Sequence, residues 1–112
     1  MFQHSVKVPR LYKTAAKIAK DVKEGNGSIK NLVYEHQRKH PNIKALYALV
    51  ATLFQRHNEI ESLLKRSQFF AKEPRADPWL IKILMVELLW GRNRLPGISR
   101  PEKTVLAYEQ IF

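Results

Sequence analysis

A run of twelve residues, Trp79 to Trp90, constrains the fold more than any other stretch of the chain. It reads WLIKILMVELLW, and ten of its twelve residues are apolar, interrupted only by Lys82 and Glu87. On a helical wheel the apolar side chains point in every direction. That pattern is typical of a helix packed against neighbours on most of its sides.

The two ends of this run favour a helix over a strand or a membrane span. Asp77 can cap the first turn, Pro78 suits the first helical position, and Gly91 suits a left-handed residue just after the last turn. The length and the Leu, Met and Glu content argue against a strand. A membrane span needs about 20 apolar residues, more than this run supplies. We therefore expect a buried helix over 79–90, surrounded by amphipathic helices.

The composition constrains the partners of the chain. At 112 residues it is one domain, long enough to bury a core. Twenty Lys and Arg against ten Asp and Glu give a net charge of +10. This charge favours either general attraction to polyanions or a specific nucleic-acid partner. The absence of cysteine excludes a disulfide, a Cys-based metal site and a cysteine nucleophile from these residues. The N-terminus lacks the apolar core of a signal peptide.

Periodicity and capping residues predict five further helices and no strand. The predicted spans are 9–24, 29–39, 43–56, 59–67 and 100–112, with 1–8 as a loose arm and 71–77 as a connector. The predicted caps are Ser28, Asn42, an Asn58–Glu61 capping box and a Ser99–Glu102 capping box. The fold class is therefore all-α, a compact bundle of about six helices around the buried central helix 79–90.

Each outer helix has an apolar stripe that is expected to face the core. The predicted inward residues are Leu11, Ala15, Ile18 and Val22; Ile29, Leu32, Val33 and His36; Ile43, Leu46, Tyr47, Val50, Leu53 and Phe54; Ile60, Leu63 and Leu64; and Val105, Tyr108 and Phe112, with Ile111 beside them. Phe69 and Phe70 are interpreted as a plug on the core rather than a platform for base stacking.

A basic stripe on the first helix is the main candidate for a binding site. It consists of Arg10, Lys13, Lys17 and Lys20, on the face opposite the apolar stripe. A solvated helix face usually mixes charges of both signs, whereas this one carries four cations. A phosphate-facing role is therefore weighed beside an ordinary solvated surface. The other candidates for RNA binding are Lys30, Arg38, Lys39, Arg92 and Arg94.

Catalytic and metal chemistry is not expected within these residues. His36 and His40 are four residues apart, but zinc needs three or four ligands and no third lies near in the sequence. Gly25 and Gly27 lie between two predicted helices, so they do not form a phosphate loop between a strand and a helix. Glu87 is a lone carboxylate in the buried helix and is expected to reach a basic neighbour or the surface.

Three stretches together resemble a known family. GSIKNLVY (27–34), NIKALYALV (42–50) and LIKILMVELLWG (80–91) are similar to the N-terminal domain of the Sun-family RNA cytosine-5 methyltransferases. The most similar branch modifies large-subunit ribosomal RNA in the eukaryotic nucleolus. The resemblance covers about residues 25 to 112, and GSIK-LVY and the ELL-G ending are its most specific parts.

The resemblance implies a protein in two parts. The front part would be NusB-like and helical, and a Rossmann-like catalytic domain that binds S-adenosylmethionine would follow it. In this family one cysteine attacks the cytosine ring and a second assists release of the 5-methylcytosine product. This chain contains no cysteine, so no catalytic or cofactor-binding residue carries over to it. The helical pattern reaches Phe112 without a stop signal, so we expect the catalytic domain after it. The full-length parent would be an enzyme and this chain alone inactive.

Three functions remain open from the sequence. The first is an accessory domain in ribosome biogenesis that binds ribosomal RNA for its own catalytic domain, with no metal or membrane contact. The second is a protein-interaction module in ribosome assembly that does not bind RNA directly. The third is a helix-turn-helix DNA binder formed by 29–39 and 43–56, although its second helix offers only Lys44, Gln55 and Arg56 to read bases.

Overall fold

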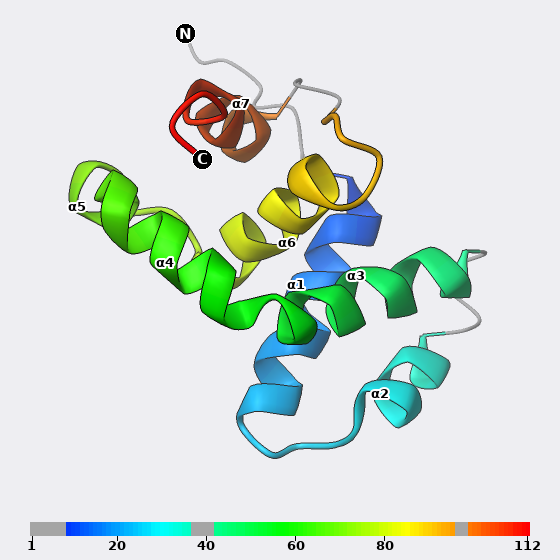
Figure 1. Cartoon of the computed structure of the whole chain (residues 1–112). Helices are drawn as coiled ribbons and strands as arrows, with labels where there is room; N and C mark the ends of the chain where they lie inside the picture. The colour runs from blue at the N-terminus through cyan, green and yellow to red at the C-terminus, as the bar shows by residue number, and fades with distance from the viewer. Residues whose placement is uncertain (1–8, 37–41, 96–98) are drawn as a thin grey trace, which may run out of the picture.

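The computed structural model describes residues 9–36, 42–95 and 99–112, and within these ranges the chain forms seven α-helices and no strand (Figure 1). The helices are α1 (Arg10–Lys23), α2 (Ile29–Glu35), α3 (Ile43–Gln55), α4 (His57–Ser67), α5 (Phe69–Lys72), α6 (Pro78–Leu89) and α7 (Arg100–Ala107). The all-α prediction is confirmed. The seventh helix is the four-residue α5, which contains Phe69 and Phe70 and the first two residues of the predicted connector 71–77.

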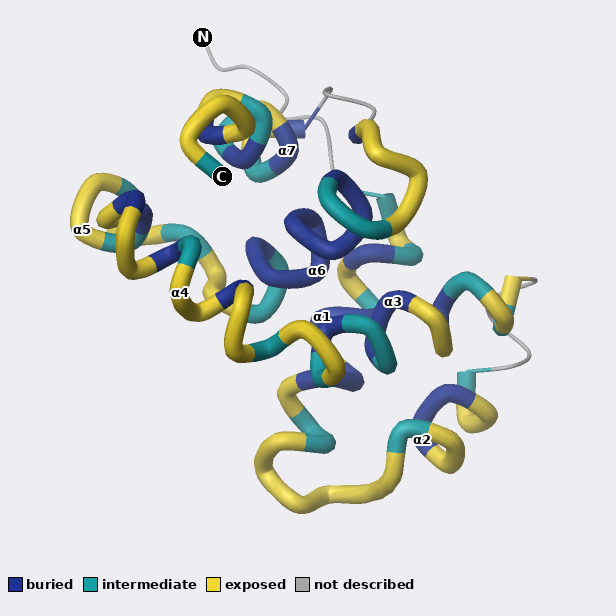
Figure 2. Tube along the Cα trace, in the orientation of Figure 1, coloured by how far each residue is buried: buried dark blue, intermediate teal, exposed yellow. Residues whose placement is uncertain are grey.

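The helix α6 is the centre of the molecule. All eight residues from 81 to 88 are buried, including both charged ones, and α1, α3 and α7 pack against it. Figure 2 shows α6 as buried along almost its whole length, whereas the outer helices are exposed on one side. The prediction from its uniform apolar pattern is therefore confirmed, because neighbours cover α6 on most of its sides.

Most of the predicted helix starts are confirmed by side-chain caps. Asp77 Oδ1 accepts a hydrogen bond from the backbone N–H of Trp79 at 3.0 Å, and Pro78 occupies the first helical position. Ser28 and Asn42 cap α2 and α3 in the same way. The remaining confirmed cap is the Ser99–Glu102 capping box, which opens α7.

The capping box predicted at Asn58 is wrong. The helix α4 begins at His57, one residue before the proposed cap, and it has no side-chain cap. Glu61, the other half of the predicted box, lies 2.6 Å from Lys82 Nζ on α6 instead. An ion pair with a neighbouring helix therefore replaces the local hydrogen bond that the spacing suggested.

The left-handed residue predicted at Gly91 is also misplaced. The positive backbone angle after α6 belongs to Asn93, whose φ is 63° and whose N–H donates to the carbonyl oxygen of Glu87 at 3.1 Å. Gly91 is required for a different reason. A Cβ at this position would contact the Glu87 carboxylate and would lie 3.0 Å from the Glu87 Cα. A larger residue there would push against α6.

Two helices end earlier than predicted. The helix α2 ends at Glu35 and not at residue 39, and His36 N–H donates to the carbonyl of Val33 in a tight turn. The predicted continuation at 37–39 lies outside the described residues. The helix α7 ends at Ala107, and the following turns bring Phe112 against the rings of Tyr108 and Phe69, with ring centroids 6.0 and 6.3 Å apart respectively.

The predicted core is largely confirmed, with differences in how deeply individual residues are buried. Tyr47 was expected inside but is 43% exposed, and Leu49 is buried in its place. On α1 the buried face is wider than predicted and includes Tyr12, Ala16 and Ala19, because α2, α3 and α6 all pack against this helix. Phe69 is fully buried, which confirms its role as a plug. Eight predicted inward residues are only half-buried: Leu11, Val22, Ile29, His36, Ile43, Phe54, Leu63 and Phe112. Ile111 is exposed.

Candidate nucleic-acid interface

Three lysines of the predicted stripe lie around one cavity. Lys13, Lys17 and Lys20 are exposed on α1, and all three line a cavity of about 490 Å³ between α1 and the start of α6. Their spacing of four and three residues keeps them on one side of the helix. Arg10 is also exposed but does not line this cavity. The structure therefore brings together three of the four residues of the stripe.

The other wall of this cavity is the N-terminus of α6, formed by 77–80. Asp77 contributes a carboxylate, but that group accepts hydrogen bonds from the backbone N–H groups of the first helical turn. Trp79 contributes a ring that already has neighbours, with Lys82 Nζ 4.6 Å from its centroid and the ring of Phe54 at 6.5 Å. Trp79 is thus a fixed wall of the cavity and not a free stacking surface.

The three lysines are exposed cations without ion-pair partners among the described residues. Within the part of the chain that the structure describes, none of Lys13, Lys17 and Lys20 makes an ion pair. The four ion pairs there involve residues on or near α4 and α6. Three cations on one well-packed helix therefore present a positive surface on which an anionic ligand would not compete with an existing partner.

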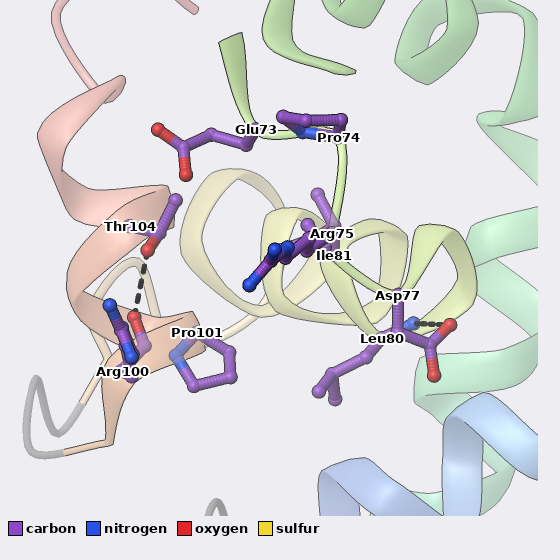
Figure 3. Close-up of a pocket in the computed structure, with 10 residues that line it drawn as sticks. Glu73, Pro74, Arg75, Asp77, Leu80, Ile81, Arg100, Pro101 and Thr104 are labelled. Atoms are coloured by element: carbon purple, nitrogen blue, oxygen red, sulfur yellow. Dashed lines mark hydrogen bonds between the residues drawn. The ribbon is translucent and has the colours of Figure 1, made fainter. Parts of the chain in front are cut away.

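A second cavity, of about 610 Å³, adjoins the first. It lies between the connector 73–76, the start of α6 and the start of α7, and Asp77 and Leu80 line both cavities. Figure 3 shows Arg75 extending from the connector toward α7, where Arg100 begins the helix. Both arginines are exposed, and neither was a candidate from the sequence. Arg75 and Arg100 are 25 residues apart in the sequence, and the packing of α7 on α6 brings them to one cavity.

The remaining predicted RNA-binding residues do not line these two cavities. Lys30 is exposed on α2, and Arg92 and Arg94 are exposed in the loop after α6. Arg38 and Lys39 lie outside the described residues. Arg56, a base-reading candidate of the helix-turn-helix alternative, is bonded to Glu59 at 2.9 Å and lies over the ring of Trp90.

The buried carboxylate of Glu87 has a structural role. Its Oε2 accepts a hydrogen bond of 2.7 Å from the Tyr12 hydroxyl, and its Oε1 accepts one of 3.2 Å from the backbone N–H of Arg92. The Arg92 guanidinium is farther away, at 3.8 Å. Burial, and then the bond to Glu87, raise the pKa of the Tyr12 hydroxyl well above its ordinary value. The expected basic neighbour is therefore present, but the main partner of Glu87 is a tyrosine that the apolar stripe did not include.

No group of three or more His, Cys, Asp or Glu side chains in the described residues could hold a metal ion, and His40 lies outside them. No described helix is long and apolar enough to cross a membrane. Gly25 and Gly27 lie in the connector between α1 and α2 and do not follow a strand, so they do not form the glycine-rich turn of a dinucleotide-binding fold.

These observations define a small helical domain on which three exposed lysines line one cavity. Comparison with known proteins shows that the chain belongs to the family described as the NOL1/NOP2/Sun domain family member 5, N-terminal domain, which matches residues 44–112. The resemblance to the Sun family is thereby confirmed. No solved structure matches the chain significantly.

Two relatives carry the same name in different animals. The chain is 35% identical over 106 residues to a 28S rRNA (cytosine-C(5))-methyltransferase of Drosophila melanogaster, which covers 95% of this chain and 24% of the relative. It is 33% identical over 90 residues to a protein of the same name in Mus musculus, covering 80% of this chain and 19% of the relative. The chain therefore spans about a quarter or less of the length of these relatives.

Proposed function

We propose that this chain is the accessory RNA-binding domain of an S-adenosylmethionine-dependent rRNA cytosine-5 methyltransferase. The observation that carries the proposal is the cavity at which Lys13, Lys17 and Lys20 meet the start of α6, where none of the three makes an ion pair with a described carboxylate. The names of the two relatives supply the class of RNA. Catalysis, cofactor binding and formation of 5-methylcytosine would belong to another part of a longer protein, acting in the nucleolus.

The lysines would act by holding phosphates. From Lys13 to Lys20 the helix rises about 10 Å, a length over which a nucleic-acid strand presents more than one phosphate. Such contacts fix the position and orientation of the RNA and carry little sequence information. Since α1 packs against α2, α3 and α6, it would hold the three charges at constant spacing. Recognition of the target cytosine would then depend on the shape of the RNA and on the catalytic domain.

Replacing Lys13, Lys17 and Lys20 with Glu tests this proposal. We expect the variant to bind all rRNA fragments more weakly than the original chain. The affinity for single strands should also lose part of its salt dependence, which is a log–log slope of roughly −0.7 for each phosphate contacted. All three side chains are exposed, so the free energy of unfolding should change by less than about 0.5 kcal/mol for each substitution. Fluorescence anisotropy across a salt series and a thermal melt measure both quantities.

The matched control replaces Lys44, Lys65 and Lys103 with Glu, which changes the net charge equally. These lysines are exposed, and none of them lines either cavity. Lys72 is avoided because it lies 6.0 Å from the ring centroid of Tyr108. Equal losses in both variants would mean that RNA binding is only general attraction to the net positive charge. If neither variant loses affinity, the protein-interaction alternative replaces this proposal.

A further inference from the structure

We propose that the bound RNA continues from the three lysines across the start of α6, and that one unpaired nucleotide enters the neighbouring cavity beside Arg75 and Arg100. This inference rests on the proposed function, but it adds a second contact region and a class of RNA. It concerns a cavity that the sequence did not predict. It also implies that the domain prefers single-stranded or looped RNA to a continuous duplex.

The two cavities form one surface. Asp77 and Leu80 line both of them, so the lysines of α1 and the two arginines lie on opposite sides of the same short ridge at the start of α6. A strand held by Lys17 and Lys20 would reach Arg75 or Arg100 by crossing this ridge. The continuity joins cations from three separate parts of the chain into a single path.

The two arginines are suited to bind a phosphate. Within the described ranges neither Arg75 nor Arg100 makes an ion pair, so both guanidinium groups are available. A guanidinium group is planar and can donate two parallel hydrogen bonds to phosphate oxygens. The hydroxyl of Thr104 is already occupied, because it donates to the carbonyl oxygen of Arg100 at 2.9 Å (Figure 3).

The rest of the cavity favours a whole nucleotide over a simple anion. Its floor includes the buried Ile81 and the half-buried Leu80 and Pro101, which offer apolar contact to the face of a base. Glu73 also lines the cavity, and its carboxylate extends toward α7 (Figure 3). A carboxylate repels a free phosphate but accepts a hydrogen bond from the exocyclic amino group of a base. A volume of about 610 Å³ is within the range of small-ligand sites.

The base must be unpaired for this contact. The major groove of an RNA duplex is deep and narrow, so side chains do not read its base edges, whereas unstacked bases of loops and single strands can enter a protein cavity. A duplex could still place its phosphates on the lysines, but it would leave the floor at Leu80 and Ile81 empty. The two regions should therefore respond differently to the strandedness of the RNA.

The test compares a single-stranded oligonucleotide of rRNA sequence with a duplex of the same length. In the chain carrying Arg75→Ala and Arg100→Ala, we expect single-strand affinity to fall roughly tenfold, while duplex affinity changes little. The matched control, Lys44→Ala with Lys65→Ala, should retain its affinity for both, because both lysines are exposed and line neither cavity. Circular dichroism and a thermal melt would verify that the exposed substitutions leave the fold intact.

Two further measurements locate the nucleotide. A single strand carrying 4-thiouridine should crosslink to the segments 73–81 and 100–104. Replacing the crosslinked nucleotide with an abasic one should weaken binding to the original chain but not to the double arginine variant. Equal losses for single strand and duplex, or no crosslink in these segments, would overturn the inference and leave the lysine proposal intact. If the variant with Lys13, Lys17 and Lys20 replaced by Glu retained its full RNA affinity, both proposals would be wrong.

Discussion

The two charged residues of α6, Lys82 and Glu87, are buried to a similar extent, but their charged groups have different kinds of partner. Lys82 is 8% exposed and Glu87 4%. The ammonium of Lys82 lies 2.6 Å from the carboxylate of Glu61, whose side chain is 50% exposed. Glu87 instead accepts a hydrogen bond from the buried hydroxyl of Tyr12. The lysine is therefore paired at the edge of the solvent, and the glutamate inside the protein.

This difference separates two uses of a buried charge. A long side chain can cover apolar surface with its stem while its charged end reaches the surface, which describes Lys82 beside the ring of Trp79. In this position it joins α4 to α6. Glu87 is shorter and depends on donors that are themselves fixed, and it connects α1 and the loop after α6 to the central helix. Removing a partner should therefore cost more at Glu87 than at Lys82.

Introducing an unpaired charge into α6 should reduce the stability of the fold more than any other change considered. Leu84 lies between the two charged residues and is fully buried. Leu84→Asp would place a carboxylate among apolar side chains, which costs several kcal/mol, so we expect the chain to be unfolded. Loss of the helical circular dichroism signal and of a cooperative melt would show this. A folded variant with unchanged stability would mean that α6 tolerates charge without the partners described above.

Removal of the Glu87 carboxylate should have an intermediate effect. Glu87→Ala leaves the Tyr12 hydroxyl and the Arg92 N–H without their acceptor and opens space beside Gly91. We expect the free energy of unfolding to fall by about 2–3 kcal/mol, measured by urea denaturation. Glu109→Ala is the control, since Glu109 is exposed and should change stability by less than about 0.5 kcal/mol. Equal effects would show that Glu87 stabilises nothing specific.

Because the pKa of Tyr12 is raised, the stability contributed by the Tyr12–Glu87 pair should depend on pH. A group whose pKa is higher in the folded state contributes stability that is present below its unfolded pKa and is lost as the pH rises through the folded value. The ordinary value for tyrosine is 10.0, so the loss should begin in alkaline solution above it. The acid range should not be affected by this group. Glu87→Ala should reduce the alkaline loss along with the stability at neutral pH.

The features that sequence could predict depend on residues close together in the chain. Asp77 and the Ser99–Glu102 capping box act over two or three residues, so spacing alone identified them. The same local rule misassigned Glu61, because its real partner on α6 is visible only after folding. The hydrogen bond from Tyr12 to Glu87 joins residues 75 positions apart, and no pattern in the sequence predicts it.

The candidate interface also combines local features that the sequence predicts with features that depend on packing. The spacing of Lys13, Lys17 and Lys20 predicted that these residues share one side of α1, because helical geometry is local. The start of α6 as the opposite wall, and the adjoining cavity with Arg75 and Arg100, depend on how three segments pack together. Arg92 and Arg94 were predicted as a basic pair at the start of the loop after Gly91, but they line neither cavity.

Weakening the Lys82–Glu61 pair should have the smallest effect, and it should appear mainly in acid. The hydrogen bond from Lys82 holds the pKa of the Glu61 carboxyl below its ordinary value of 4.5, although burial acts in the opposite direction. A lowered pKa in the folded state contributes stability above the unfolded pKa, and this stability is lost as the pH falls through the folded value. Glu61→Gln should therefore make the free energy of unfolding less dependent on pH below about 4.5. Near neutral pH it should cost less than about 1 kcal/mol, because the pair is partly exposed to solvent.

The corresponding change on α6 tests whether the pair accounts for this acid sensitivity. Lys82→Met retains the apolar stem and removes the ammonium, so it should flatten the acid part of the stability curve as Glu61→Gln does. The double variant should be no flatter than either single variant, because each change alone abolishes the same interaction. Urea denaturation at a series of acid pH values measures all three. If Glu61→Gln leaves the slope unchanged, the acid sensitivity lies elsewhere, and the main partners of Lys82 become the ring of Trp79 and the imidazole of His57, whose Nε2 lies 3.4 Å from Lys82 Nζ. In that case both charges of α6 would be satisfied inside the protein, and the contrast between its two ends would disappear.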